Sequence, residues 1–209
     1  MANTIEANGT TGAEAGSTAR SGAVARLPLR LLIGGIVCGA FLVILLSVSG
    51  KMWWAEAWIL SGAYFLYFVL YILWGTFRAP ELLEERARPG RNAKRWDLVM
   101  MRGIYVPLFI GLFVVPALDE RFGWTYVGLA VRLAAGVLAL ASGVWIMWVM
   151  DTNRFASGVV RIQSDRDQSV ISTGPYSVVR HPMYLGNVAL FVAIPIVPVS
   201  YTHLTLPTN

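Results

Sequence analysis

The stretch Leu31–Val48, LLIGGIVCGAFLVILLSV, contains 18 consecutive residues without a charge. Because a helix that crosses a bilayer needs about 20 apolar residues, this stretch predicts a membrane-spanning helix. The last of the later runs is short and is interrupted by Pro195 and Pro198. The four later apolar runs lie at about Met52–Phe77, Val99–Leu118, Trp124–Met150 and Tyr184–Val199. We therefore expect an all-α integral membrane protein with about five transmembrane helices.

The composition of the whole chain favours the same class. Of its 209 residues, 56% are hydrophobic and 14% are charged, and the mean hydropathy is +0.58. A soluble domain carries about 25% charged residues, and a single core cannot bury so much apolar surface. A disordered chain is excluded for the same reason. The single cysteine, Cys38, excludes a disulfide scaffold, and we expect it to serve as inert packing.

The basic residues are concentrated on one side of the predicted bundle. Thirteen of the 17 lie in the N-terminal flank, the loop after the second run and the segment after the fourth run. Since cytoplasmic loops carry the excess of Lys and Arg, we predict that the N-terminus and both long loops are cytoplasmic. The probable-looking alternative for a net charge of +5, nucleic acid, does not fit this distribution. We expect membrane lipids as neighbours and a bacterial inner membrane as the location.

Three parts can be distinguished along the chain. Residues 1–26 are rich in Ala, Gly, Ser and Thr and have no apolar periodicity, so we expect them to be disordered. Residues 27–199 form the predicted helical domain. Residues 200–209, SYTHLTLPTN, contain no Asp, Glu, Lys or Arg and have no helix-forming character. We interpret them as a tail of foreign sequence.

The segment Asp151–Gly186 is too polar to span a membrane, yet it leads directly into the last apolar run. Gly174-Pro175 predicts a turn, and Pro182 suits the first turn of a helix. The segment is therefore expected to form a cytoplasmic loop that ends at a helix start, with Arg180, His181 and Tyr184 located there. Free backbone N–H groups at such a start can bind an anion.

Residues 174–186, GPYSVVRHPMYLG, resemble the GPYxxVRHPxYxG signature of isoprenylcysteine carboxyl methyltransferases and related phospholipid methyltransferases. Asp151-Thr152-Asn153-Arg154-Phe155 and Val160-Arg161-Ile162-Gln163 also resemble bacterial members of this family. The hydropathy pattern extends the resemblance over about residues 31–199. The resemblance implies methyl transfer from S-adenosylmethionine, at the membrane surface, to an acceptor with a lipid tail.

In this family the RHPxY segment helps to enclose the cofactor. The resemblance therefore implies two groups of site residues: His181, Tyr184, Tyr176, Pro182 and Gly186 for binding S-adenosylmethionine, and Arg154 and Arg180 for catalysis. An aromatic face can favour the sulfonium cation, and an arginine can pair with an anionic acceptor or with the carboxylate of the cofactor. No spacing of His, Cys, Asp and Glu in the sequence indicates a bound metal.

The acceptor is left open by this reasoning. A carboxylate, as on a prenylated cysteine, loses no proton when it is methylated, so positioning alone can supply most of the rate. A phospholipid amine is the next option, and it needs a proton acceptor. Family members also continue with a further apolar stretch and a helix bearing paired glutamates, which predicts that part of the pocket is missing here and this chain alone inactive. A sterol-type NADPH-dependent membrane reductase and a non-catalytic membrane subunit are the alternatives.

Three charged features have simpler interpretations. We expect Arg102 and Arg132, which lie within apolar runs, to pack or to extend toward the membrane surface. The stretch Arg78–Arg95 combines basic residues with three glutamates and is typical of an amphipathic helix near anionic lipid.

Overall fold

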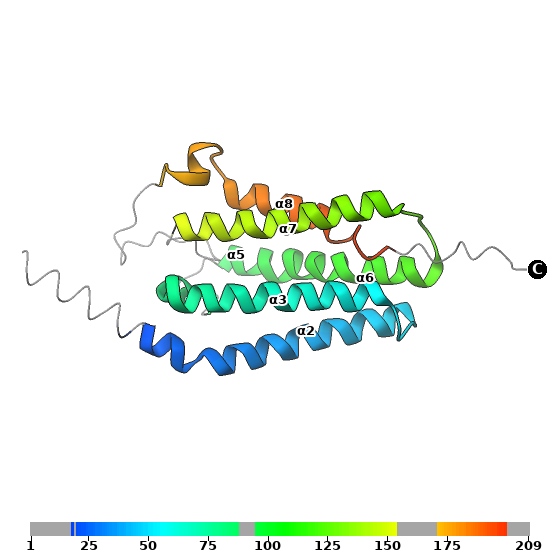
Figure 1. Ribbon diagram of the computed structural model, residues 1–209, viewed down its shortest axis with the longest axis horizontal. Helices are drawn as coiled ribbons and strands as arrows, with labels where there is room; N and C mark the ends of the chain where they lie inside the picture. The colour runs from blue at the N-terminus through cyan, green and yellow to red at the C-terminus, as the bar shows by residue number, and fades with distance from the viewer. Residues whose placement is uncertain (1–17, 19, 88–94, 154–170, 200–209) are drawn as a thin grey trace, which may run out of the picture.

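The computed structural model describes residues 18, 20–87, 95–153 and 171–199, and within these ranges every regular element is a helix. Figure 1 shows an elongated bundle with its long helices side by side. Four helices are long and apolar enough to cross a membrane: α2 (Leu27–Ser49), α3 (Ala55–Arg78), the continuous helix Leu98–Phe122 and α7 (Leu129–Thr152). The prediction of an all-α membrane protein is confirmed.

The surface of the bundle has the character of a lipid-facing surface. Val137, Leu140 and Val144 on α7 are 67%, 70% and 71% exposed. Large apolar side chains exposed in this way along a helix would be unfavourable in water but are at home in hydrocarbon. The apolar runs of the sequence therefore report contact with lipid as much as a buried core.

The third spanning helix is assembled from three pieces. It consists of α5 (Arg95–Met100), a π-helical turn (Met101–Tyr105) and α6 (Val106–Phe122). Pro107 has no N–H to donate to the preceding turn, which accounts for the loss of regular α-helical bonding just before it. Arg102 lies exposed in the π-helical turn, near the end of the span, where its side chain can extend toward the membrane surface.

The fourth run becomes helical later than the sequence predicts. Residues 124–128 are irregular, and α7 begins at Leu129. The Asp119 carboxylate accepts hydrogen bonds from the Thr125 backbone N–H (2.8 Å) and the Thr125 hydroxyl (2.9 Å). These bonds hold the link between α6 and α7 in a turn, so the first apolar residues of the run are not helical.

The fifth run forms a shorter helix than the others, α8 (Pro182–Ala193), which packs against α7. At about 1.5 Å per residue, its 12 residues span only about 18 Å, well short of the hydrocarbon core. Residues 194–198 continue as turns because Pro195 and Pro198 interrupt helical bonding. The described residues thus contain four spanning helices and one partial one.

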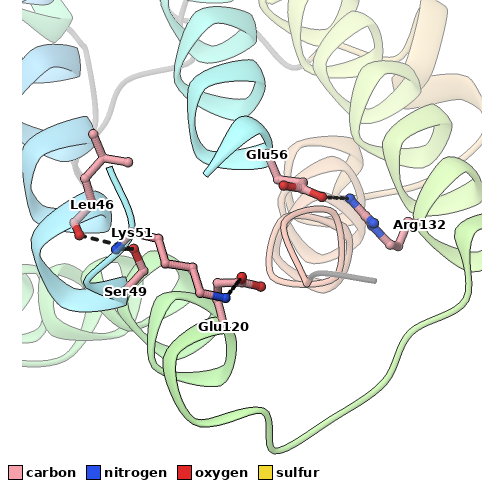
Figure 2. Close-up of polar contacts among 6 residues, drawn as sticks. All are labelled: Leu46, Ser49, Lys51, Glu56, Glu120 and Arg132. Atoms are coloured by element: carbon pink, nitrogen blue, oxygen red, sulfur yellow. Dashed lines mark hydrogen bonds and ion pairs between the residues drawn. The ribbon is translucent and has the colours of Figure 1, made fainter. Parts of the chain in front are cut away.

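The two ends of the bundle differ. We call the end at which α2–α3 and α6–α7 are linked the hairpin end, and the end at which α7 ends and α8 begins the motif end (Figure 1). At the hairpin end, Arg132 pairs with Glu56 at 2.9 Å and donates from Nε to the carbonyl of Val197 at 3.3 Å. Lys51 pairs with the buried Glu120 (Figure 2). Arg132, expected to pack or extend to the surface, therefore ties α3, α7 and the end of the fifth run together.

At the motif end, the short helix α4 (Pro80–Arg86) lies against the bundle. Leu82 and Leu83 are buried, whereas Glu81 is exposed, so α4 is amphipathic over its described length. Residues 88–94, the middle of the predicted amphipathic stretch, lie outside the described residues. The Glu84 carboxylate pairs with Arg30 at 2.6 Å and with Arg26 at 2.5 Å, which joins α4 to the start of α2.

Helical structure also begins earlier than the expected boundary at residue 26. Residues 20–25 are helical, Ala23 is fully buried, and the Arg20 guanidinium lies 5.7 Å from the centre of the Phe77 ring. Packing against the end of α3 gives these small residues a reason to be ordered that their composition does not indicate. Residues 1–17, 19 and 200–209 lie outside the described residues, so the expectations for both termini stay predictions there.

The attachment of α4 to α2 should depend on pH. Burial raises the pKa of Glu84, but the hydrogen bonds and charges of Arg30 and Arg26 outweigh burial and hold this pKa below its ordinary value of 4.5. The stabilisation is therefore fully present above about pH 4.5 and is lost as the pH falls through the lowered pKa. We expect Glu84→Gln to lower the unfolding temperature in detergent at pH 7 and to have no effect at pH 3.

The control for this prediction is Glu81→Gln, which removes a carboxylate from the exposed face of the same helix. Equal losses of thermal stability in the two variants at pH 7, or a Glu84→Gln loss that persists unchanged at pH 3, would contradict the ion-pair explanation.

Candidate functional site

The motif residues are gathered at one end of the bundle. The stretch from Thr173 to Gly186 includes a 3-10 turn (Gly174–Ser177) and the first turn of α8, beside the end of α7 (Figure 1). The end of α3, α4 and the start of α2 lie at the same end of the bundle. Residues 154–170, with the catalytic candidate Arg154, lie outside the described residues. The described part of the site is therefore built from α7, the 3-10 turn and α8.

The turn that enters the motif is attached to the end of α7. Gly174 has φ +58°, a conformation that side chains with a Cβ rarely adopt, and a Cβ there would lie 3.0 Å from the Thr152 hydroxyl oxygen. Asn153 donates from Nδ2 to the Tyr176 hydroxyl oxygen at 2.8 Å. Pro175 is fully buried. Tyr176, predicted as a cofactor-binding residue, is thus half-buried and held by α7.

The start of α8 is attached to the middle of α7. Trp145 donates from Nε1 to the carbonyl of Pro182 at 2.8 Å. Pro182 is fully buried, and a Cβ on Gly186 would lie 2.7 Å from Ile146 Cγ1 and 2.9 Å from Trp145 Cδ1. Both residues were predicted to bind the cofactor. Their positions between α7 and α8 favour a packing role instead, since neither presents much surface to a ligand.

The other three predicted residues are exposed at the helix start. Arg180 and His181 are exposed, and Tyr184 is 67% exposed. The His181 and Tyr184 rings have centroids 5.6 Å apart and planes tilted by 30°. This arrangement places a guanidinium, an imidazole and an aromatic ring together on the polar end of an apolar bundle.

The helix start offers fewer free backbone donors than the sequence predicts. Pro182 has no N–H, and the Tyr184 and Leu185 N–H groups donate to the His181 carbonyl at 3.1 and 3.2 Å. An anion at this position would therefore rely mainly on side chains such as that of Arg180, rather than on the backbone.

A contact that sequence reasoning missed joins α3 to the motif end. The Asp151 carboxylate accepts from Trp74 Nε1 at 3.1 Å and lies 4.0 Å from the Arg78 guanidinium. Trp145 and Trp74 were equally invisible as partners of the motif, because 37 and 77 residues separate donor and acceptor. The one available signal was their donor-only indole N–H, which usually finds an acceptor when it leaves water.

A small apolar cavity lies elsewhere, between α2, α3 and α6. Cys38, Phe41, Leu45, Leu60, Ser61, Tyr64 and Phe113 line it, and none of these residues belongs to the motif. Cys38 is buried with a free thiol, as expected of a packing residue. In the described ranges, no three His, Cys, Asp or Glu side chains are placed to hold a metal ion.

Replacement of Gly186 by alanine should loosen the motif end. The added Cβ overlaps Ile146 and Trp145 on α7, so α8 must shift, at a cost of about 1–3 kcal/mol in the free energy of unfolding. Denaturation in mixed micelles measures this cost. Gly136→Ala is the matched control, since a Cβ there meets nothing within 4 Å. Equal stabilities of the two variants would rule out a close approach at Gly186.

Comparisons with known proteins support the resemblance of the motif. No curated protein and no solved structure matches the chain. Residues 131–208, which include nearly all of α7, the 3-10 turn and α8, match the family model for phospholipid methyltransferases. A family of this kind implies methyltransferase activity on a lipid-related substrate. The C-terminal part of the chain, residues 131–208, therefore belongs to the phospholipid methyltransferase family.

Proposed function

We propose that this protein transfers a methyl group from S-adenosylmethionine to the carboxylate of a lipidic acceptor of the isoprenylcysteine type, at the cytoplasmic face of the membrane. The observation that carries the proposal is the exposed group of Arg180, His181 and Tyr184 at the start of α8, inside the family match. The steps below concern these side chains and the surface beside them.

The exposed side chains fit S-adenosylmethionine by their chemistry. When bound, this cofactor supplies an electrophilic methyl group on a sulfonium. The Tyr184 and His181 rings, 5.6 Å apart, can hold the cation against an aromatic face. Arg180 can pair with the amino-acid carboxylate of the cofactor or with an anionic acceptor. Arg154 is a second candidate for this pairing.

The same helix offers a surface for the lipid tail. Leu185 and Val188 follow Tyr184 on α8 and are 51% and 61% exposed. A prenyl or acyl chain lying along α8 would therefore bring its polar end to the Arg180–Tyr184 group. Access from the bilayer for the acceptor and from water for the cofactor meets at one helix start.

The choice of a carboxylate rests on proton accounting. Methylation of a carboxylate releases no proton, so the residues need only hold and orient the two reactants. An amine acceptor needs a base at the reacting nitrogen, and among the described motif residues only His181 is a natural candidate. The cytoplasmic assignment rests on the basic residues of the motif end, which include Arg26, Arg30 and Arg78.

The product distinguishes the acceptor classes. With methyl-labelled S-adenosylmethionine and the full chain in vesicles, we expect label on a prenylated cysteine and its release as volatile methanol in base, since the product is an ester. Base-stable label on phosphatidylethanolamine would replace the carboxylate by an amine. Absence of transfer, together with tighter binding of NADPH than of S-adenosylmethionine, would overturn methyl transfer in favour of a reductase.

Substitution of His181 tests the cofactor position. We expect His181→Ala to raise the Kd for S-adenosylmethionine roughly fivefold to tenfold, because the sulfonium loses one ring, while insertion and thermal stability stay unchanged. Titration calorimetry in detergent measures the Kd. Trp53→Ala, which truncates a 90% exposed ring at the hairpin end, is the control. An unaltered Kd in the His181 variant would remove this residue from the pocket.

A further inference from the structure

The indole of Trp145 reaches the one backbone carbonyl that lies between the exposed site residues. It belongs to α7, seven residues before the end of that helix, and donates to the carbonyl of Pro182 at 2.8 Å. Pro182 is the first residue of α8, with His181 directly before it and Tyr184 two residues after it. A single hydrogen bond therefore connects the interior of α7 to the turn that carries both rings.

The geometry around this bond requires the particular neighbours that the motif supplies. Trp145 can approach because Gly186 has no Cβ, which would lie 2.9 Å from the indole Cδ1. The Pro182 carbonyl lies in the first turn of α8, and a carbonyl has two lone pairs, so it can accept the indole N–H as well as a helical bond. The fixed φ of proline makes the position of this carbonyl a good reporter of the direction of the whole turn.

The bond constrains what the rest of the motif leaves free. Tyr176 is held by Asn153, and Gly174 by its contact with Thr152, but these contacts act before the chain reaches Val178. Arg180 and His181 are exposed and have no printed side-chain hydrogen bond, and the N-cap position has no side-chain cap. The orientation of His181 and Tyr184 toward a ligand therefore depends on the attachment of Pro182 to α7.

We propose that Trp145 is a positioning residue for methyl transfer: its indole N–H fixes the first turn of α8 and so orients His181 and Tyr184 toward S-adenosylmethionine. The proposal rests on the proposed function for the identity of the cofactor. Trp145 is half-buried behind the first turn and acts through Pro182, not by contact with the reactants. Its contribution is to orientation, in which shifts of about 1 Å can change rates by two orders of magnitude.

Trp145→Phe tests this role, because it keeps an aromatic ring and removes only the N–H donor and part of the ring. Trp58→Phe is the matched control: Trp58 also donates its indole N–H to a backbone carbonyl, that of Met52, at 3.2 Å, but at the hairpin end. Both variants are made in the full chain in detergent. Amide hydrogen exchange and titration with S-adenosylmethionine are measured on each.

We expect the amides of Tyr184, Leu185 and Gly186 to exchange about fivefold faster in Trp145→Phe than in the wild type, with no change in Trp58→Phe. The Kd for S-adenosylmethionine should rise on the order of tenfold in the first variant only. Unchanged exchange in the first turn of α8 would overturn the positioning role. Faster exchange with an unchanged Kd would also overturn it, since the loosened turn would not matter to the ligand.

The exchange measurement separates this proposal from the proposed function. If the wild type binds no S-adenosylmethionine, the proposed function fails, whereas faster exchange in Trp145→Phe would still support a role for the indole in fixing the turn. If the wild type binds S-adenosylmethionine and the two variants behave alike, the proposed function stands and the role of Trp145 fails.

Discussion

The close approach of α8 to α7 at Gly186 is the constraint on which the motif end depends. The space that a Cβ would fill is occupied by Ile146 and Trp145, and this brings the indole within reach of the Pro182 carbonyl. Once Pro182 faces α7, the helical period directs neighbouring side chains elsewhere, and Tyr184 is exposed. The buried and exposed members of the motif are two consequences of one packing contact.

The membrane acts as the second constraint, and it explains where the charges lie. Glu56 pairs with Arg132 and Lys51 with Glu120 at the hairpin end, whereas Glu84 pairs with two arginines at the motif end. Paired charges near the ends of spanning helices avoid the cost of an unpaired charge in hydrocarbon. The Arg132 bond to the Val197 carbonyl has a further effect, because it holds the end of the fifth run near the hairpin end although α8 stops at Ala193.

The apolar runs predicted the spanning helices well, since length and hydropathy are local properties of the sequence. They placed the start of the fourth helix near Trp124, because the side-chain bonds from Thr125 to Asp119 that hold residues 124–128 in a turn are not visible in hydropathy. The motif identified the residues of the candidate site through resemblance. It could not separate Tyr184 from Pro182, because exposure follows from packing against Trp145, a residue 37 positions away.

A site that joins a polar cofactor to a lipid must be reached from two solvents, and this requirement restricts where it can lie. In the interior of the bundle a charged cofactor would lose its hydration, and on a loop far from the bundle a lipid tail would have to leave the bilayer. The start of a helix that lies against a spanning helix satisfies both conditions, because its first turn faces water and its later turns face lipid. Tyr184 and Val188 are one turn apart on α8 and exposed. The distance between the two environments on this helix is therefore one helical turn, about 5.4 Å, which is short enough for one small acceptor group to meet the donor without either reactant leaving its own solvent.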